Sequence, residues 1–340
     1  MLNTPILFLI FNRPELTQRV FSQIAKAKPT KLFVAADGAR NESEKVVCEQ
    51  TRTIIDQIDW ECEVFTLFRD KNLGCRNAVE SAISWFFDNV EQGIILEDDC
   101  LPNNSFFSFC EEMLDRYQED TRVMHIGGAN FQNGIQRGEA SYYFSRIMHC
   151  WGWASWRRAW HLNDPNLDTF KRFHNENLVV DLYDDVRIQN FLMKHLSAIY
   201  RGDLNTWCFV WFYSVLIQHG LCIIPNHNLI SNIGFGVDST HCADSNSPDA
   251  NRPVVELENF NAPSMRLIST AGDTYTFDHH YQIRRQHPPL RTYIQRHPLF
   301  LFKKKFWNRY VFNRNNCREK TSPCARLYRV KTYDISKKDA

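Results

Sequence analysis

Apolar and polar positions in the first hundred residues follow two different periods. Short runs rich in apolar residues predict strands at residues 5–11, 31–36, 63–68 and 93–96. Between them, apolar positions recur every three or four residues, which predicts helices starting at Pro14 and spanning residues 44–58 and 77–87. This repeated alternation predicts an α/β fold with a Rossmann-like, doubly wound sheet and helices on both faces.

The pattern is less regular after residue 121. Residues 123–126, 221–225 and 229–230 are expected to be short strands, and aromatic blocks occupy residues 149–160 and 207–213. Residues 231–261 have the Gly, Asn, Ser and Asp content of a long loop. We therefore divide the chain into residues 1–121, residues 122–283 and a C-terminal extension, residues 284–340.

Composition and charge narrow the class of protein. The 340 residues are 44% hydrophobic and 23% charged, as in ordinary globular proteins, and no apolar run reaches the ~18 residues of a membrane span. The extension carries 16 Lys or Arg against 3 Asp or Glu, so a basic, aromatic tail follows an acidic body. The first residues predict a strand and no signal peptide. The eleven cysteines show no C-x-x-C spacing, which argues against a zinc ribbon and favours reduced thiols in the cytosol.

Polar residues follow all four predicted strands of the first region. Ligands of doubly wound sheets bind beyond the carboxyl ends of the strands. Here those ends carry Asn12-Arg13, Asp37-Gly38, Arg69-Asp70 and Glu97-Asp98-Asp99. Neither G-x-G-x-x-G nor G-x-x-x-x-G-K-[ST] follows a strand, which argues against a dinucleotide fold and a P-loop.

The triplet Glu97-Asp98-Asp99 is the strongest candidate for chemistry. Adjacent carboxylates repel one another unless a cation lies near them, and oxygen ligands suit Mg²⁺ or Mn²⁺. Such an ion could neutralise the charge of a departing diphosphate. The alternative is a solvated acidic turn.

Other candidates are ambiguous from the residues alone. Asp37 forms a turn or accepts hydrogen bonds from a nucleobase or ribose, and Arg13 binds phosphate or caps a loop. Trp151 and Trp160 belong to the core or shape a sugar platform. His241 is a solvated loop residue or closes over a phosphate or metal.

Several short motifs together resemble GT-A-fold glycosyltransferases of the N-acetylglucosaminyltransferase I type and their bacterial relatives. The resemblance covers residues 5–241, and its motifs are ILFLIFNRP (6–14), AADG (35–38), CRNAVESA (75–82), GIILEDDCLPNNSFF (93–107), WGWASWRRAW (151–160) and LISNIGFGVDSTH (229–241). It implies a donor-binding half over residues 1–121 and an acceptor-side half over residues 122–283 of one GT-A domain.

The resemblance also implies roles for single residues. Asp99 corresponds to the direct metal ligand, with Glu97 and Asp98 as partners of the ribose, the metal shell or the donor sugar. His241 corresponds to a phosphate-side or metal-side residue on a loop that orders over the donor.

Four further residues are expected in the donor site. The resemblance implies that Arg13 contacts the diphosphate and that Asp37 contacts the uracil or ribose. Asn12 and Arg76 lie in the first and third motifs and are expected among the donor-binding residues.

Two positions depart from the family pattern. The family has a proposed catalytic aspartate directly after a tryptophan, but here Trp207 is followed by Cys208, and a family histidine is missing near Gly74. Asp203 is a weak candidate for the missing base.

The sequence thus predicts an inverting, Mn²⁺- or Mg²⁺-dependent transferase that moves a hexosyl or N-acetylhexosaminyl group from a nucleotide-diphosphate sugar, with uridine favoured, to a glycan or lipid-linked acceptor. We expect a cytoplasmic protein, peripheral on the inner face of the membrane through its basic tail; a solvated tail is the alternative. A binding module that has lost catalysis is the second hypothesis, motivated by Cys208. Nucleic-acid binding is disfavoured because the acidic body would repel phosphates, and metal-dependent phosphoester hydrolysis is a remote alternative.

Overall fold

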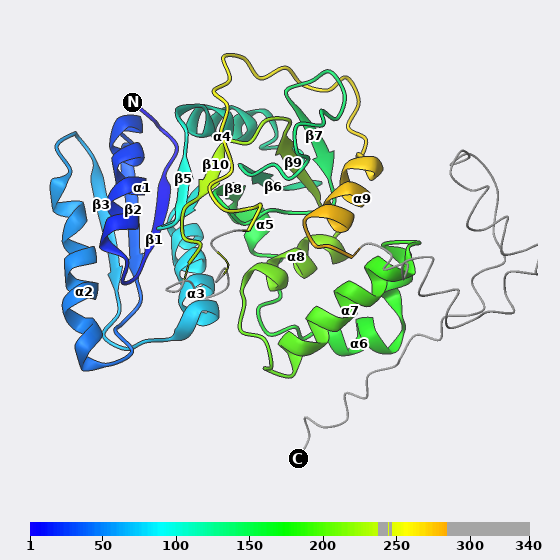
Figure 1. Ribbon diagram of the computed structural model, residues 1–340, viewed down its shortest axis with the longest axis horizontal. Coiled ribbons are helices and arrows are strands. Elements are labelled where there is room, and N and C mark those ends of the chain that lie inside the picture. The colour runs from blue at the N-terminus through cyan, green and yellow to red at the C-terminus, as the bar shows by residue number, and fades with distance from the viewer. Residues whose placement is uncertain (237–243, 245–246, 284–340) are drawn as a thin grey trace, which may run out of the picture. The chain divides into compact units, whose positions relative to one another are not determined.

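Four parallel strands build the first half of a mixed sheet. The computed structural model describes residues 1–236, 244 and 247–283. Within them the strands run in the spatial order β3-β2-β1-β4 (Figure 1). Their bounds are β1 (Ile6–Ile10), β2 (Lys31–Ala36), β3 (Glu63–Phe68) and β4 (Gln92–Glu97). Every connection between them passes through a helix, as the alternating pattern predicted.

The sheet continues past β4 with four more strands. β8 (Trp153–Trp156) pairs antiparallel with both β4 and β6 (Val123–Gly127), and β9 (Leu221–Pro225) and β7 (Tyr142–Ser145) complete the far side. A separate antiparallel ribbon joins β5 (Cys100–Pro102) to β10 (Ile230–Asn232). The described residues therefore have the predicted Rossmann-like mixed α/β fold, and residues 1–282 form one compact unit.

Helices cover both faces of this sheet. In chain order, the structure has α1 (Pro14–Ala27), α2 (Glu42–Arg52), a 3-10 turn η1 (Thr53–Gln57), α3 (Gly74–Asn89), α4 (Asn104–Arg116), α5 (Arg157–Trp160), α6 (Phe170–Asn175), a second 3-10 turn η2 (Leu178–Asp181), α7 (Val186–Tyr200), α8 (Cys208–Ile217) and α9 (Thr270–His279). Local chemistry explains several starts: Pro14 opens α1, and the side chains of Asn41 and Asn103 cap α2 and α4 by accepting from backbone N–H groups.

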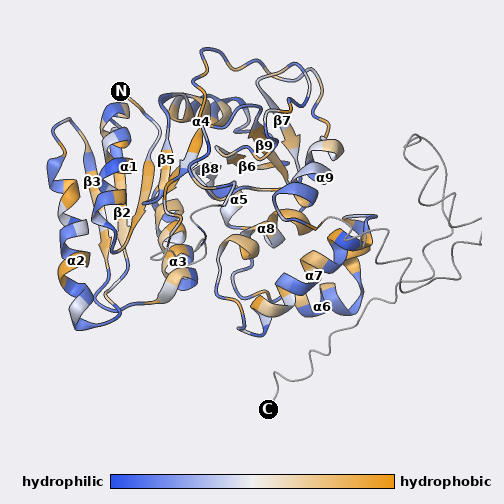
Figure 2. Ribbon diagram, viewed as in Figure 1, coloured by the Kyte–Doolittle hydropathy of each residue, from blue (hydrophilic) through white to orange (hydrophobic). Residues whose placement is uncertain are grey.

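Alternate residues of β1 pack on opposite layers. Ile6, Phe8 and Ile10 join the cluster that contains residues of α1 and α4. On the other face, Phe33 of β2 packs edge-on against Phe86 of α3, with ring centroids 5.1 Å apart. Figure 2 shows this arrangement as apolar strands between helices that are polar on their outer sides. Because β1 is buried on both faces, its polar continuation at residues 12–13 leaves the core only where the strand ends.

The structure differs from the sequence prediction in several elements. The helix expected over residues 44–58 ends at Arg52 and continues as η1. The first aromatic block contains the central strand β8, and the second forms α8, which is buried on nearly every side. The predicted tail, residues 284–340, lies outside the described residues.

Candidate functional site

The carboxyl ends of β1, β2 and β4 meet at one edge of the sheet. β1 lies between the other two strands, in parallel register with both, and Leu9 is opposite Glu97. Residues that follow the three strands consequently surround one cavity of about 200 Å³, whose lining includes Arg13, Asp37 and Glu97. The structure therefore brings these three predicted site residues together.

A neighbouring cluster of polar side chains shapes the same cavity. Asn12 and Arg40 both line it, and both donate to Glu44, with 2.6 Å between Nδ2 of Asn12 and Oε1 of Glu44. The hydrogen bond from Arg40 lowers the pKa of Glu44 to about 2, so Glu44 remains ionised. Arg40 was missed from the sequence, although its position four residues after β2 was a usable signal.

The acid triplet turns inward around Arg13. Asp98 is only 2% exposed, and Arg13 donates from Nη2 and Nε to its carboxylate and from Nη1 to Oδ2 of Asp99 at 3.0 Å. Burial raises the pKa of Glu97, and Asp99 and Asp98 raise it further, whereas Arg13 opposes the rise. Burial also raises the pKa of Asp98 against the pull of Arg13. The guanidinium is thus the cation that balances this group among the described residues.

The loop after β10 packs directly on Asp99. Ile233 donates its backbone N–H to the carbonyl of Asp99 at 2.8 Å. At Gly234 there is no room for a side chain, because a Cβ would lie 2.3 Å from Oδ2 of Asp99. The chain continues from here toward His241, which lies outside the described residues.

Asp37 organises the loop between β3 and α3. Its carboxylate accepts backbone N–H groups of Gly38, Leu73 and Gly74 at 2.9–3.1 Å, so it caps the start of α3. Gly38 is required because a Cβ there would lie 2.4 Å from the backbone of Lys71. Asp37 therefore fixes the shape of the cavity wall in addition to lining the cavity.

Two other predicted residues lie away from the cavity lining. Arg76 donates to the carbonyl of Pro165 and lies 3.6 Å from a carboxylate oxygen of Glu80. The side chain of Asp203 is 59% exposed and pairs with Arg201 at 2.8 Å. Neither residue is among those lining the 200 Å³ cavity.

Cys208 occupies the position where the resemblance expects the aspartate. It is the first residue of α8 and interacts with the thiols of Cys150 and Cys75, of which Cys75 lines the cavity. The hydrogen bond with Cys208 and burial both raise the pKa of Cys150. The eight cysteines in the described part of the chain form no disulfide with one another.

The acid triplet does not form a closed metal cage. Within residues 1–236, 244 and 247–283, no group of three or more His, Cys, Asp or Glu side chains is arranged to hold a metal ion. Mg²⁺ commonly uses one or two carboxylates and completes its shell with water and substrate phosphate oxygens. Asp99, with 18% of its side chain exposed, fits a site of that open kind.

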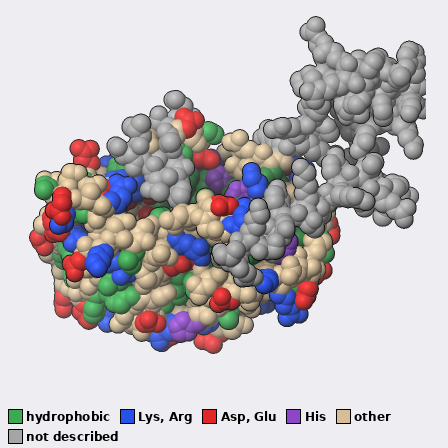
Figure 3. All heavy atoms as spheres, turned by 90° about the horizontal axis from the view of Figure 1, so that it is seen from below, with side chains coloured by type: hydrophobic (Ala, Val, Ile, Leu, Met, Phe, Trp, Pro, Cys, Tyr) green, Lys and Arg blue, Asp and Glu red, His purple; other side chains and the backbone are tan. Residues whose placement is uncertain are grey.

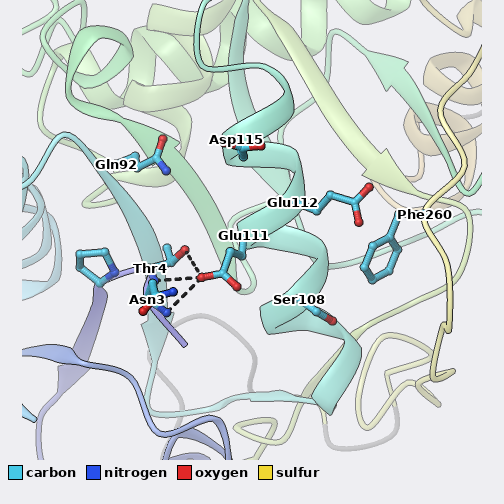
Figure 4. A pocket seen from close by; sticks show the side chains of 9 residues that line it. Asn3, Thr4, Gln92, Ser108, Glu111, Glu112, Asp115 and Phe260 are labelled. Carbon is cyan, nitrogen blue, oxygen red and sulfur yellow. Dashed lines mark hydrogen bonds between the residues drawn. The ribbon is translucent and has the colours of Figure 1, made fainter. Parts of the chain in front are cut away.

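A second cavity, of about 560 Å³, lies at the opposite ends of the strands. Figure 4 shows Glu111 of α4 pointing toward Asn3 and Thr4, just before β1. Glu111 accepts both backbone N–H groups and the Thr4 hydroxyl at 3.1–3.2 Å. This contact anchors the chain start to α4.

The surface carries charges of both signs, and the described helices are of ordinary length. Figure 3 shows acidic and basic side chains interspersed over one face, without a continuous basic patch among the coloured residues. Among the described helices, none combines the length and apolar character needed to cross a bilayer.

Comparisons with known proteins give only distant similarities. No family model matches the sequence, and no curated protein matches it significantly. HddC from Yersinia pseudotuberculosis aligns with 46% of this chain and 77% of its own, at 6% identity and a TM-score of 0.30. UDP-glucose pyrophosphorylase complexed with UDP-glucose aligns with 42% of this chain and 62% of its own, at 14% identity and a TM-score of 0.24. Inositol-1-phosphate CTP transferase from T. maritima aligns with 48% of this chain and 76% of its own, at 9% identity and a TM-score of 0.29. Similarity at these scores assigns no activity to this chain.

Proposed function

We propose that the protein is an inverting, cation-dependent glycosyltransferase that takes a hexosyl or N-acetylhexosaminyl group from a UDP-sugar. The observation that carries this proposal is the cavity shared by Arg13, Asp37 and Glu97 at the carboxyl ends of three parallel strands. The resemblance of the sequence motifs to GT-A enzymes points to the same chemistry. The acceptor would be a hydroxyl of a glycan or of a lipid-linked sugar.

In this proposal Arg13 binds the diphosphate of the donor, and the acid triplet binds the cation. Arg13 is held by Asp98 and keeps its positive charge, because Asp98 and Asp99 outweigh the opposing effect of burial and raise its pKa. Its guanidinium can bind the diphosphate, and Asp37 holds the adjoining wall in place. Asp99 would hold a Mn²⁺ or Mg²⁺ ion, which would neutralise charge on the leaving diphosphate.

Transfer requires an acceptor oxygen to attack the anomeric carbon opposite the diphosphate. The new C–O bond forms as the bond to the phosphate oxygen breaks, and the electron pair leaves with UDP. The acceptor hydroxyl must lose its proton to a base. Inversion is implied by the resemblance alone.

Release of UDP tests the function. The full chain, incubated with a panel of UDP-sugars and Mn²⁺, is expected to release UDP from at least one of them, and Asp99→Ala should lower the rate at least about 100-fold. The matched control is Asp115→Asn, an exposed acid at the opposite edge of the sheet. An Asp99→Ala variant as active as the wild type would refute the role of the triplet.

A nucleotide-sugar-binding module without catalysis is the second candidate, because Cys208 replaces the expected carboxylate. Calorimetry would then show UDP binding with Mn²⁺, and the UDP-release assay would show no turnover of any donor. A gain of UDP release in Cys208→Asp would support this candidate, and full wild-type activity would eliminate it.

We further propose that the basic tail, which lies outside the described residues, attaches the protein to anionic membranes. Its 16 Lys and Arg residues would be attracted to anionic lipid. The full chain should co-sediment with phosphatidylglycerol vesicles, and a truncation after Ile283 should not. Equal sedimentation of both would overturn this part of the proposal.

A further inference from the structure

A histidine and an aspartate from separate elements form a partly buried pair in the acceptor-side half. Nδ1 of His280, the residue directly after α9, lies 2.9 Å from Oδ2 of Asp249, and each side chain is less than one-fifth exposed. Arg252 also pairs with Asp249 at 2.8 Å. Burial alone would raise the pKa of Asp249, but His280 and Arg252 outweigh it and lower the pKa, so the carboxylate is ionised. Because a carboxylate can only accept, Nδ1 is the donor of this hydrogen bond, and Nε2 is the ring nitrogen through which His280 could act as a base.

Aromatic rings connect this pair to the acid triplet. The imidazole of His280 is 6.3 Å from Trp151, and Trp151 is edge-on to Phe235 at 5.7 Å, measured between ring centroids. Phe235 directly follows Gly234, which packs on Asp99. The pair therefore lies two rings away from the predicted metal ligand.

The backbone holds the turn of Asp249 in the same place. Asn251 donates its N–H to the carbonyl of Asn232 at 2.9 Å, and Asn232 pairs with Cys100, which follows Asp99. On the other side, β8 runs antiparallel to β4, so Trp151, two residues before β8, arrives at the edge where β4 delivers Glu97. Strand pairing thus places the pair beside the edge of the sheet that carries the triplet.

We propose that His280 is the catalytic base, with Asp249 as its positioning residue. This inference rests on the proposed glycosyl transfer. Nε2 takes the proton of the acceptor hydroxyl as its oxygen bonds to the anomeric carbon, UDP leaves with the electron pair of the broken bond, and the imidazolium then returns the proton to solvent. Such a base supplies what Cys208 cannot and what Asp203, exposed and paired with Arg201, is badly placed to supply.

Aromatic, titratable and charged groups surround the imidazole of His280. The titratable and charged groups facing it among the described residues are Asp249, Arg252, His149 and Tyr281. Burial, followed by His280, holds the pKa of His149 well below its usual range, and burial raises that of Tyr281, so both stay neutral. Phe131 stacks on the imidazole at 3.8 Å and fixes the plane of the ring. No described residue hydrogen-bonds to Nε2.

The test compares two neighbouring histidines of the full chain. His279, whose ring stacks on Tyr275 at 3.9 Å, supplies the matched control. The assay measures UDP release from UDP-sugars with water as the acceptor. We expect His280→Gln to lower this rate at least about 100-fold and His279→Gln to retain the wild-type rate. Calorimetry should show the same UDP affinity with Mn²⁺ in both variants within about twofold. The fall of the rate toward acid pH should disappear in His280→Gln.

Asp249→Asn distinguishes a role in catalysis from a role in stabilising the loop. As a positioning residue, Asp249 should lower the rate when changed and leave the melting temperature close to that of His280→Gln. The proposal is wrong if His280→Gln and Asp249→Asn lose rate only in proportion to their unfolded fraction and keep the wild-type pH profile. The pair would then have a structural role alone. A wild-type chain that turns over no donor would instead overturn the proposed function, whereas an active wild type with an equally active His280→Gln would overturn the base alone.

Discussion

Arg13 and Asp99 form an ion pair across the ends of β1 and β4, with 3.0 Å between Nη1 and Oδ2. The same guanidinium also pairs with the buried Asp98. A cation bound by Asp99 would therefore compete with Arg13 for that carboxylate. The guanidinium of Arg13 would then be released from Asp99 and could turn toward a diphosphate. Donor binding and cation binding are expected to strengthen each other for this reason.

Removal of Arg13 should expose the cost of burying Asp98. Arg13→Gln is expected to lower the free energy of unfolding by about 3 kcal/mol, because it leaves a carboxylate in the interior without its partner. Urea unfolding at pH 7 measures this loss. The double variant Arg13→Gln, Asp98→Asn should be more stable than Arg13→Gln alone; a double variant that is equally unstable would show that the charge of Asp98 is not the cause.

A neutral side chain at Asp99 should affect the cation more than the fold. In the wild type, Mn²⁺ is expected to increase UDP affinity at least about tenfold, and Asp99→Asn should abolish this increase. The free energy of unfolding should change by less than about 1 kcal/mol in the variant. Calorimetry with and without Mn²⁺ checks the first part. An unchanged response to Mn²⁺ would place the cation elsewhere.

A methyl group at Gly234 should disturb the same carboxylate from outside. In Gly234→Ala the new Cβ would meet Oδ2 of Asp99 at 2.3 Å, so one of the two must move. We expect UDP affinity to fall in the presence of Mn²⁺ and to stay the same in its absence. Equal losses under both conditions would point to a general change of the loop.

Glu80 should make the fold less stable as the pH rises. Burial raises its pKa from 4.5 to about 7, against the pull of Arg76, so the folded state binds a proton more tightly than the unfolded state. The resulting stabilisation is complete below pH 4.5 and is lost as the pH rises through 7. Glu80→Gln should flatten this dependence and be more stable than the wild type at pH 8, by roughly 2 kcal/mol. Thermal melts between pH 5 and pH 8 measure it, and parallel curves would contradict the assignment.

Glu111 gives a prediction about the chain start alone. Glu111→Ala removes the acceptor of three hydrogen bonds from Asn3 and Thr4 and should cost about 2 kcal/mol. UDP affinity should stay within about twofold of the wild type, since this contact lies at the opposite edge of the sheet. A large loss of UDP binding would show that the two edges are coupled.

The parallel half of the sheet and its carboxyl edge could be predicted from the sequence because their signals are local. Continuous apolar runs mark β1 and β4, and the polar residues at or just beyond their carboxyl ends, Arg13 and Glu97, must reach the carboxyl edge. The inward turn of Asp98 was not predictable, because it depends on Arg13, 85 residues away. The same holds for Asp37, whose partners Leu73 and Gly74 belong to another loop.

The second half of the sheet, after β4, was harder to predict because its patterns are either uniformly apolar or non-local. Trp153–Trp156 forms a strand buried on both faces, and periodicity does not distinguish such a strand from a buried helix. Asp249 and His280 lie 31 residues apart in segments without a regular period, and no spacing rule connects them. Only the backbone links of the two segments to the sheet bring them together.

The antiparallel entry of β8 between β4 and β6 separates two kinds of variation. Its amino end meets the carboxyl end of β4, so the segment leading into it reaches the edge of the sheet that carries Glu97 without contributing to the parallel strands. Residues inserted or exchanged in that segment would reshape that part of the edge and leave the register of β1 and β4 intact. In the proposed glycosyltransferase, the choice of acceptor could accordingly diverge while the donor site is conserved.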